Sequence, residues 1–177
     1  MLTQAVNQTL ACIGYFETFL HGGGEIHNRN EPGNPVSQRE GVLEKQMRER
    51  QILARACAIA KAGGVQEALS EGTLPGIVDV TLSEGVIIGL LKQGVRKFFG
   101  ILGHGNTDLG EILRIYAEAG ALRFLQCRNE TAMAHAATAL AWIYGETPAV
   151  LSSIGPGPLM AYAGSLAAAS NGVGVYH

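Results

Sequence analysis

Three short segments in the second half of the chain contain residue types that could bind a ligand or move a proton. They are Gly103-His104-Gly105-Asn106, Cys127-Arg128-Asn129-Glu130 and Ser152-Ser153-Ile154-Gly155-Pro156-Gly157. Glu130 is the strongest candidate for proton transfer, because a carboxylate held away from water binds a proton more readily and can share it with a ligand nitrogen. The alanines that follow Glu130 are small, so another surface could approach closely and exclude water.

Each of these residues also has a structural interpretation. Glu130 could simply stabilise a helix N-terminus, where the helix dipole favours a negative charge. Glycines after strands commonly make turns, and a proline between them commonly stiffens the turn. His104 is typical of a solvated loop residue, and His135, among alanines, is typical of a packed one.

The three segments each follow a predicted strand. Short β-branched and aromatic runs predict the strands, and apolar residues at three- and four-residue spacing predict helices between them. The predicted order is helix 81–94, strand 95–102, helix 107–120, strand 121–126, helix 129–145, strand 147–154 and helix 158–170. This alternation predicts an α/β fold, with a parallel sheet and helices on both faces. Because the carboxyl ends of such strands meet at one edge, the three segments should be neighbours.

Two smaller predictions concern packing and helix starts. Met133, Trp142 and Met160 are expected to pack in the interior. Thr81 and Glu84 have the spacing of a capping box, in which each side chain accepts a hydrogen bond from a free backbone amide of the first turn.

The first part of the chain is predicted to be a helical N-terminal extension over residues 1–76. Helices are predicted over 2–20 and 38–61, with a glycine- and proline-rich loop over 21–36 between them. In the second helix, one face is expected to be buried, made of Leu43, Met47, Leu53 and Cys57. The α/β domain then spans 77–177, and because Val173–His177 look like the opening of a fourth strand, it is expected to be truncated at its C-terminal end.

Composition excludes several classes of partner. The chain has 13 Lys+Arg against 15 Asp+Glu and a formal net charge of −2, so we expect neither nucleic acid nor a membrane surface as partner. No apolar run approaches the roughly 20 residues of a membrane helix. Cys12, Cys57 and Cys127 form no Cys-x-x-Cys pair, so we expect no disulfide framework, no metal ligands and a cytoplasmic location.

A dinucleotide-binding site is the first alternative. The stretch Gly-His-Gly-Asn-Thr-Asp-Leu-Gly (103–110) follows a strand and opens a helix, as a Gly-x-Gly-x-x-Gly fingerprint would. The position of the third glycine is Asp108, whose negative charge would repel a pyrophosphate at the helix start. The sequence therefore disfavours phosphate binding here.

Taken together, the segments resemble the N-terminal pyrimidine-binding domain of thiamine diphosphate enzymes. The resemblance rests on Gly103–Asn106, Arg128–Ala137 and Ser152–Val175, in that order, and covers about Val80 to His177. The pattern is most similar to trihydroxycyclohexanedione hydrolases and, more distantly, to acetolactate synthases.

The resemblance implies roles for individual residues. Glu130 would be the catalytic residue and would activate the cofactor by a hydrogen bond to a ring nitrogen of its aminopyrimidine. The implied cofactor-binding residues are Asn129, Glu130, Gly155, Pro156 and Gly157, and the implied substrate pocket is Gly103, His104, Gly105 and Asn106. The reaction would make or break a C–C bond next to a carbonyl in a small substrate.

The resemblance also implies a partner. Family members hold the diphosphate and its Mg²⁺ on a separate domain with a Gly-Asp-Gly motif, which this sequence lacks. Their active site lies between domains of two subunits, so we expect a diphosphate-binding domain or subunit and at least a dimer. Alone, the chain should bind the cofactor weakly and have no activity.

Two other functions stay open at this point. One is a nucleotide-binding module of oxidoreductase type, and the other is a non-catalytic regulatory or interaction subunit with the same fold. The sequence leaves undecided the substrate, the presence of FAD, and whether the reaction is hydrolysis, decarboxylation or ligation. It also leaves undecided whether the chain is a fragment or one subunit of a split enzyme.

Overall fold

A computed structural model of the chain describes residues 35–177, with side chains from residue 42 onward. The predicted helix over 2–20 and residues 21–34 of the predicted loop lie outside the described residues. Residues Glu44–His177 form one compact unit. The predicted domain division near Gly76 stays a prediction.

The described elements follow the predicted order. The helices are α2 (Pro35–Ala62), α3 (Val65–Ser70), α4 (Leu82–Lys92), α5 (Thr107–Glu118), α6 (Glu130–Tyr144) and α7 (Pro156–Ser170). The strands are β1 (Lys97–Gly100), β2 (Arg123–Gln126) and β3 (Ala149–Leu151), and a single 3-10 turn, η1 (His104–Asn106), precedes α5. The strands are shorter than predicted, and the one-and-a-half-turn helix α3 was not predicted.

The three strands form one parallel sheet in the order β2-β1-β3. Phe98 on β1 pairs with Phe124 on β2 and with Ala149 on β3. Beyond β3, Tyr176 makes an isolated parallel bridge to Ala149, and its carbonyl accepts a hydrogen bond from the Val150 amide at 2.8 Å. The chain end therefore lies as the opening of a fourth strand would.

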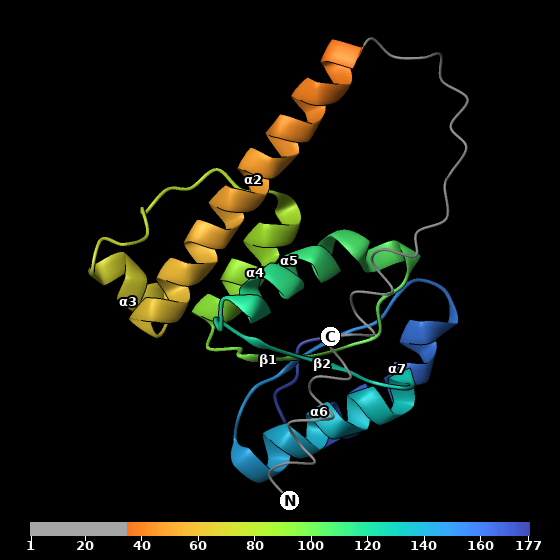
Figure 1. The fold of residues 1–177 in the computed structure, drawn as a ribbon. Coiled ribbons are helices and arrows are strands. Elements are labelled where there is room, and N and C mark those ends of the chain that lie inside the picture. The colour runs from red at the N-terminus through yellow and green to blue at the C-terminus, as the bar shows by residue number, and fades with distance from the viewer. Residues whose placement is uncertain (1–34) are drawn as a thin grey trace, which may run out of the picture. The chain divides into compact units, whose positions relative to one another are not determined.

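Helices cover both faces of the sheet, as the alternation of side chains along β1 requires. Phe98 packs into a cluster with residues of α2, α3, α4 and α5, whereas its neighbour Phe99 packs on the opposite face with residues of α6 and α7. Figure 1 shows α4 and α5 on one side of the strands and α6 on the other. The predicted α/β fold with helices on both faces is confirmed.

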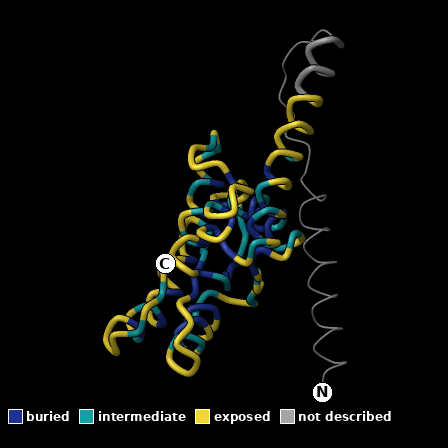
Figure 2. Tube along the Cα trace, turned by 90° about the vertical axis from the view of Figure 1, so that its left-hand side faces the viewer, coloured by how far each residue is buried: buried dark blue, intermediate teal, exposed yellow. Residues whose placement is uncertain are grey.

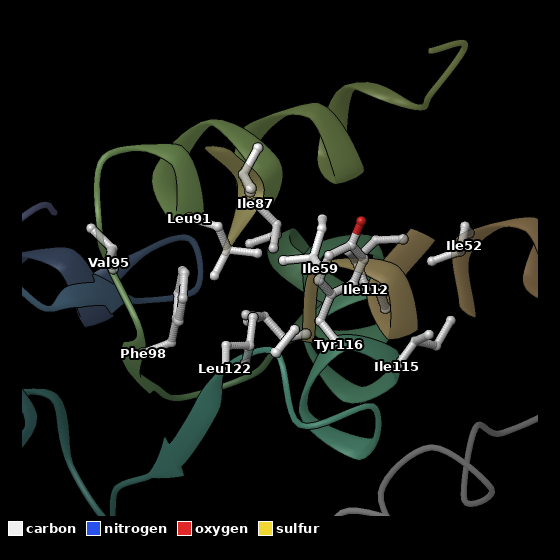
Figure 3. Packing of buried hydrophobic residues seen from close by; sticks show 14 of the residues in the cluster. Ile52, Ile59, Ile87, Leu91, Val95, Phe98, Ile112, Ile115, Tyr116 and Leu122 are labelled. Atoms are coloured by element: carbon white, nitrogen blue, oxygen red, sulfur yellow. The ribbon is translucent and has the colours of Figure 1, made fainter. Parts of the chain in front are cut away.

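The buried face of α2 differs from the predicted one. Its buried residues are Ile52, Ala56 and Ile59, which pack with the apolar faces of α4 and α5 (Figure 3). The predicted face, from Leu43 through Met47 and Leu53 to Cys57, is exposed instead. The helix carries two apolar stripes, each with helical spacing, and the one that contacts the domain is the stripe of Ile52, Ala56 and Ile59.

The capping box at the start of α4 is only half formed. The Glu84 amide donates to Thr81 Oγ1 at 3.2 Å, as predicted. The Glu84 carboxylate instead turns into the interior, where Arg55 and Tyr116 donate to it. The predicted role of that carboxylate as a cap is therefore wrong.

Of the side chains expected in the interior, Met133 is fully buried but Trp142 and Met160 are not. Trp142 is 62% and Met160 48% exposed, and His135 is exposed too. Buried residues concentrate in the interior (Figure 2), and in the sheet they lie on β1 and β3, whereas no residue of β2 is buried. Among residues 35–177, no helix is long and apolar enough to cross a membrane.

Candidate functional site

The three predicted segments meet at the carboxyl edge of the sheet. The Gly105 amide, in the segment after β1, donates to Ser153 Oγ, in the segment after β3, at 3.3 Å. The segment after β3 also contacts the segment after β2, because a Cβ atom placed on Gly157 would lie 2.9 Å from Glu130 Oε1. The segment after β3 therefore joins the other two, and the predicted neighbourhood is confirmed.

Glu130 is the first residue of α6 and is half-buried. Asn129 precedes it as the N-cap, and its Oδ1 accepts a hydrogen bond from the Ala132 amide at 2.7 Å. The helix N-terminus is a favourable place for a negative charge. None of the ion pairs among residues 42–177 includes Glu130, so no cation of the described chain neutralises it.

The wall opposite Glu130 is backbone. Gly155 has a φ of 81°, which side-chain-bearing residues rarely adopt, and it turns the chain into α7. Pro156 is the first residue of α7, where its missing amide hydrogen costs nothing. Gly157 is buried against the Glu130 carboxylate, and a larger residue there would displace that carboxylate. The Gly-Pro-Gly segment thus leaves room for one carboxyl group at its surface.

The segment after β1 is a tight turn that Asn106 holds together. Asn106 is buried, its Oδ1 accepts from the Gly103 amide at 2.8 Å, and its Nδ2 donates to the Ile101 carbonyl at 3.2 Å. His104 and Gly105 are exposed. Asn106 therefore supports the turn, and His104 is the side chain that the turn presents.

A hollow of about 190 Å³ adjoins this turn. It is lined by Ser83, His104, Gly105, Asn106, Thr107, Asp108 and Leu109. Ser83 comes from the first turn of α4 and was not predicted as a site residue. No local signal in the sequence could have found it, because it reaches the hollow through the packing of α4 against α5.

A larger hollow, of about 340 Å³, lies between α2 and α5 and away from the three segments. Its lining includes Arg114 and Glu118. Arg114 is engaged with Glu111 and Glu118 in ion pairs, and these raise the pKa of its guanidinium above the usual value. Arg114 is thus already paired, and we do not assign the hollow, which Glu49 and Arg50 also line, as a ligand site.

Comparison with known proteins gives one family. The model of the family described as thiamine pyrophosphate enzyme, N-terminal TPP binding domain, matches residues 80–177, which are more than half of the chain. No curated protein was found to match the chain. The matched residues include all three strands and all three segments at the edge of the sheet. The chain therefore belongs to the thiamine pyrophosphate enzymes and contains their N-terminal TPP-binding domain.

Proposed function

We propose that this chain holds the aminopyrimidine end of thiamine diphosphate in an enzyme that makes or breaks a C–C bond next to a carbonyl. The observation that carries the proposal is the Glu130 carboxylate, which is half-buried, lies against the backbone of Gly157 and has no ion-pair partner among residues 42–177. A carboxyl group in this setting suits a hydrogen bond to a ring nitrogen. The residues present therefore fit the pyrimidine end of the cofactor.

Glu130 is the proton-handling group of the proposal. When bound, thiamine diphosphate would supply a nucleophilic carbon and an electron-accepting ring for chemistry next to a carbonyl. The chain contributes a carboxyl oxygen of Glu130, which holds a proton against the pyrimidine ring nitrogen. Asn129 serves by capping α6, which fixes the residue that follows it, and Gly155, Pro156 and Gly157 form the wall beside the ring.

The substrate would lie at the other end of the site, beside the turn Gly103–Asn106. His104 is the exposed polar side chain of that turn, and Asn106 supports it from beneath. We propose a small carbonyl compound as the substrate. The trihydroxycyclohexanedione hydrolases and acetolactate synthases that the segments resemble act on such compounds, and hydrolysis, decarboxylation and ligation all fit the site.

The partner in this proposal is a diphosphate-binding domain or subunit that also holds Mg²⁺. The existence of such a partner is supported by the outer sides of α6 and α7. These sides expose large apolar side chains, among them Trp142 (62%), Leu159 (78%) and Tyr162 (63%). Helix α7 has no charged residue, and α6 has Glu130 as its only carboxylate. An uncharged, aromatic-rich surface of this kind is typical of the core of a protein interface. We propose that the partner covers it, in an assembly of at least two subunits.

Binding of the pyrimidine half tests the first step. The probe is 4-amino-5-hydroxymethyl-2-methylpyrimidine, titrated into the isotope-labelled chain while amide NMR signals are followed. We expect shifts confined to residues 128–132 and 155–158, which Glu130→Gln reduces and the exposed-site control Glu71→Gln does not. Tight binding of NAD, with no response to the pyrimidine, would favour the nucleotide-binding alternative.

Turnover tests the second step. In the enzyme assembled with its diphosphate-binding partner, thiamine diphosphate and Mg²⁺, Glu130→Gln should lower turnover by about 10²-fold or more, because a positioned proton-transfer group contributes this much. Glu71→Gln should leave turnover unchanged. Undiminished turnover in Glu130→Gln would contradict the proposed role. If neither the parent nor the two variants turn over substrate in the assembly, the result would favour a regulatory subunit.

A further inference from the structure

Glu84 is the only carboxylate among residues 42–177 that is fully buried. Both of its oxygens are used. Arg55 Nε donates to Oε1 at 2.8 Å, Arg55 Nη2 donates to Oε2 at 2.6 Å, and the Tyr116 hydroxyl donates to Oε1 at 3.0 Å. A buried carboxylate without partners is strongly disfavoured, so these bonds are what keeps Glu84 in the interior.

The three residues tie three helices together. Arg55 lies on α2, Glu84 on the first turn of α4, and Tyr116 near the end of α5. Of the three, Tyr116 belongs to the apolar cluster that these helices share (Figure 3). The two-point contact of Arg55 fixes both the distance and the orientation of the carboxylate, which a single-point contact from lysine would not. This cluster of Arg55, Glu84 and Tyr116 therefore sets how α4 lies against α2 and α5.

The cluster is next to the hollow at the turn Gly103–Asn106. Ser83, which precedes Glu84, lines that hollow together with His104 and Asp108. Helix α5, which carries Tyr116, begins directly after the turn. A movement of the first turn of α4 would therefore move one wall of the hollow.

We propose that Arg55 is a positioning residue for the substrate end of the site: by holding the Glu84 carboxylate, it fixes Ser83 and the first turn of α4 against the turn that presents His104. The substrate assignment of this hollow rests on the proposed function. Arg55 lies outside residues 80–177, which match the family. The residue that positions α4 therefore belongs to a helix that precedes the matched domain.

The charge state of the cluster agrees with this role. The hydrogen bond from Arg55 to Glu84 raises the pKa of the guanidinium above its usual value, so Arg55 remains a charged donor. Burial, and then the nearby Glu84 charge, raises the pKa of the Tyr116 hydroxyl, so that hydroxyl stays a donor. Both hydrogen-bond donors of the cluster are thus retained.

The alternative is that the cluster only stabilises the fold. The variant Arg55→Met/Glu84→Leu/Tyr116→Phe separates the two, because replacing a whole buried polar cluster by apolar groups of similar size often preserves stability. Amide hydrogen exchange of residues 103–109 in the full, unliganded chain is the readout. We expect a folded variant in which exchange at these amides is about tenfold faster than in the parent.

The matched control removes an ion pair that lies at the amino end of β1, away from the turn. Lys97→Gln/Glu146→Gln should leave exchange at 103–109 unchanged. Unchanged exchange in the folded triple variant would overturn the proposal. If the triple variant does not fold, the Arg55→Lys variant is measured instead. Amide exchange at residues 103–109 that is as slow in Arg55→Lys as in the parent overturns the proposal. Faster exchange at these residues in a folded Arg55→Lys variant supports it.

A kinetic readout separates this proposal from the proposed function. In the assembled enzyme, Arg55→Lys should raise KM for the substrate about tenfold and change kcat less than twofold, because it loosens the substrate end and leaves Glu130 untouched. The hydrogen-exchange result does not depend on cofactor or substrate. If the Glu130 experiments fail, the hydrogen-exchange result therefore remains valid. If the hydrogen-exchange experiment fails, the proposed role of Glu130 remains valid.

Discussion

At the scale of single residues, the site depends on the contact between Glu130 and Gly157. An atom added at Gly157 would lie 2.9 Å from Glu130 Oε1, which is closer than a carbon and an oxygen atom pack without displacement. The carboxylate must then move away from the wall. The position of the Glu130 carboxyl oxygen is therefore set by the absence of a side chain opposite it.

Gly157→Ala should lower turnover of the assembled enzyme by about 10²-fold, because displacing a reacting group by on the order of 1 Å costs this much. The matched control is Gly89→Ala in α4, where an added methyl group meets nothing within 4 Å. That variant should keep full turnover and raise the free energy of unfolding by about 0.5–1 kcal/mol. Equal turnover in the two variants would mean that Gly157 does not place the carboxylate.

Tyr116 gives a stability prediction with a defined pH dependence. Burial, followed by the Glu84 charge, raises the pKa of its hydroxyl above the usual 10.0, so the folded state keeps this proton where the unfolded state releases it. The stabilising effect is complete below pH 10 and is lost as the pH rises above it, at about 1.4 kcal/mol per pH unit. At pH 8, Tyr116→Phe should cost about 1.5 kcal/mol for the lost hydrogen bond to a carboxylate.

Urea unfolding at pH 8 and pH 11 measures this effect. The difference in unfolding free energy between the parent and Tyr116→Phe should be smaller at pH 11 than at pH 8. A difference that does not change with pH would show that the hydroxyl titrates alike in the folded and unfolded chain.

At the scale of elements, sequence periodicity and breakers predicted the helices and strands of the α/β domain, because glycine and proline end elements locally. The edge at which Glu130 meets the glycine segments was predictable too, since parallel strands leave no other arrangement. Which apolar stripe of α2 is buried was not, because both have helical spacing. The pairing of Glu84 with Arg55 joins residues 29 positions apart and has no local signature.

The segment from Glu44 to Gly76 is expected to be needed for folding. Its Ile52, Ala56 and Ile59 belong to the domain's buried cluster, and its Arg55 neutralises Glu84. A chain that starts at residue 77 leaves that carboxylate buried without its cation, which costs about 3–5 kcal/mol in addition to the lost packing. This approaches the whole stability of an ordinary domain.

Circular dichroism and urea unfolding of two truncated chains measure that requirement. The chain that starts at residue 44 should unfold cooperatively, and the chain that starts at residue 77 should have no cooperative transition. Cooperative unfolding of the shorter chain would place the folding boundary near Gly76, as the sequence predicts.

At the scale of the whole molecule, the exposed outer sides of α6 and α7 are the main departure from the expected packing. Trp142 and Met160 have side chains that are usually buried, yet they are 62% and 48% exposed. Residue type indicates that a side chain is buried away from water. It does not indicate whether the side chain is buried by its own chain or by another chain. The partner proposed for these helices accounts for the exposure.

Trp142, the single tryptophan of the chain, reports on this surface directly. When the diphosphate-binding partner binds, its fluorescence should move to shorter wavelength and its quenching by acrylamide should fall. Leu159→Glu should weaken the association at least tenfold, because truncating or charging a central interface residue costs more than about 1 kcal/mol. Ile77→Glu, at a residue that is 94% exposed outside these helices, should not. Unchanged fluorescence on association would place the interface elsewhere.

The most direct measurement is a crystal structure of the assembled enzyme with thiamine diphosphate bound. A Glu130 carboxyl oxygen should lie within about 2.6–3.2 Å of the aminopyrimidine ring nitrogen, with the backbone of Gly157 beside the ring. A cofactor whose pyrimidine ring contacts other residues, with Glu130 turned toward solvent, would contradict the central claim.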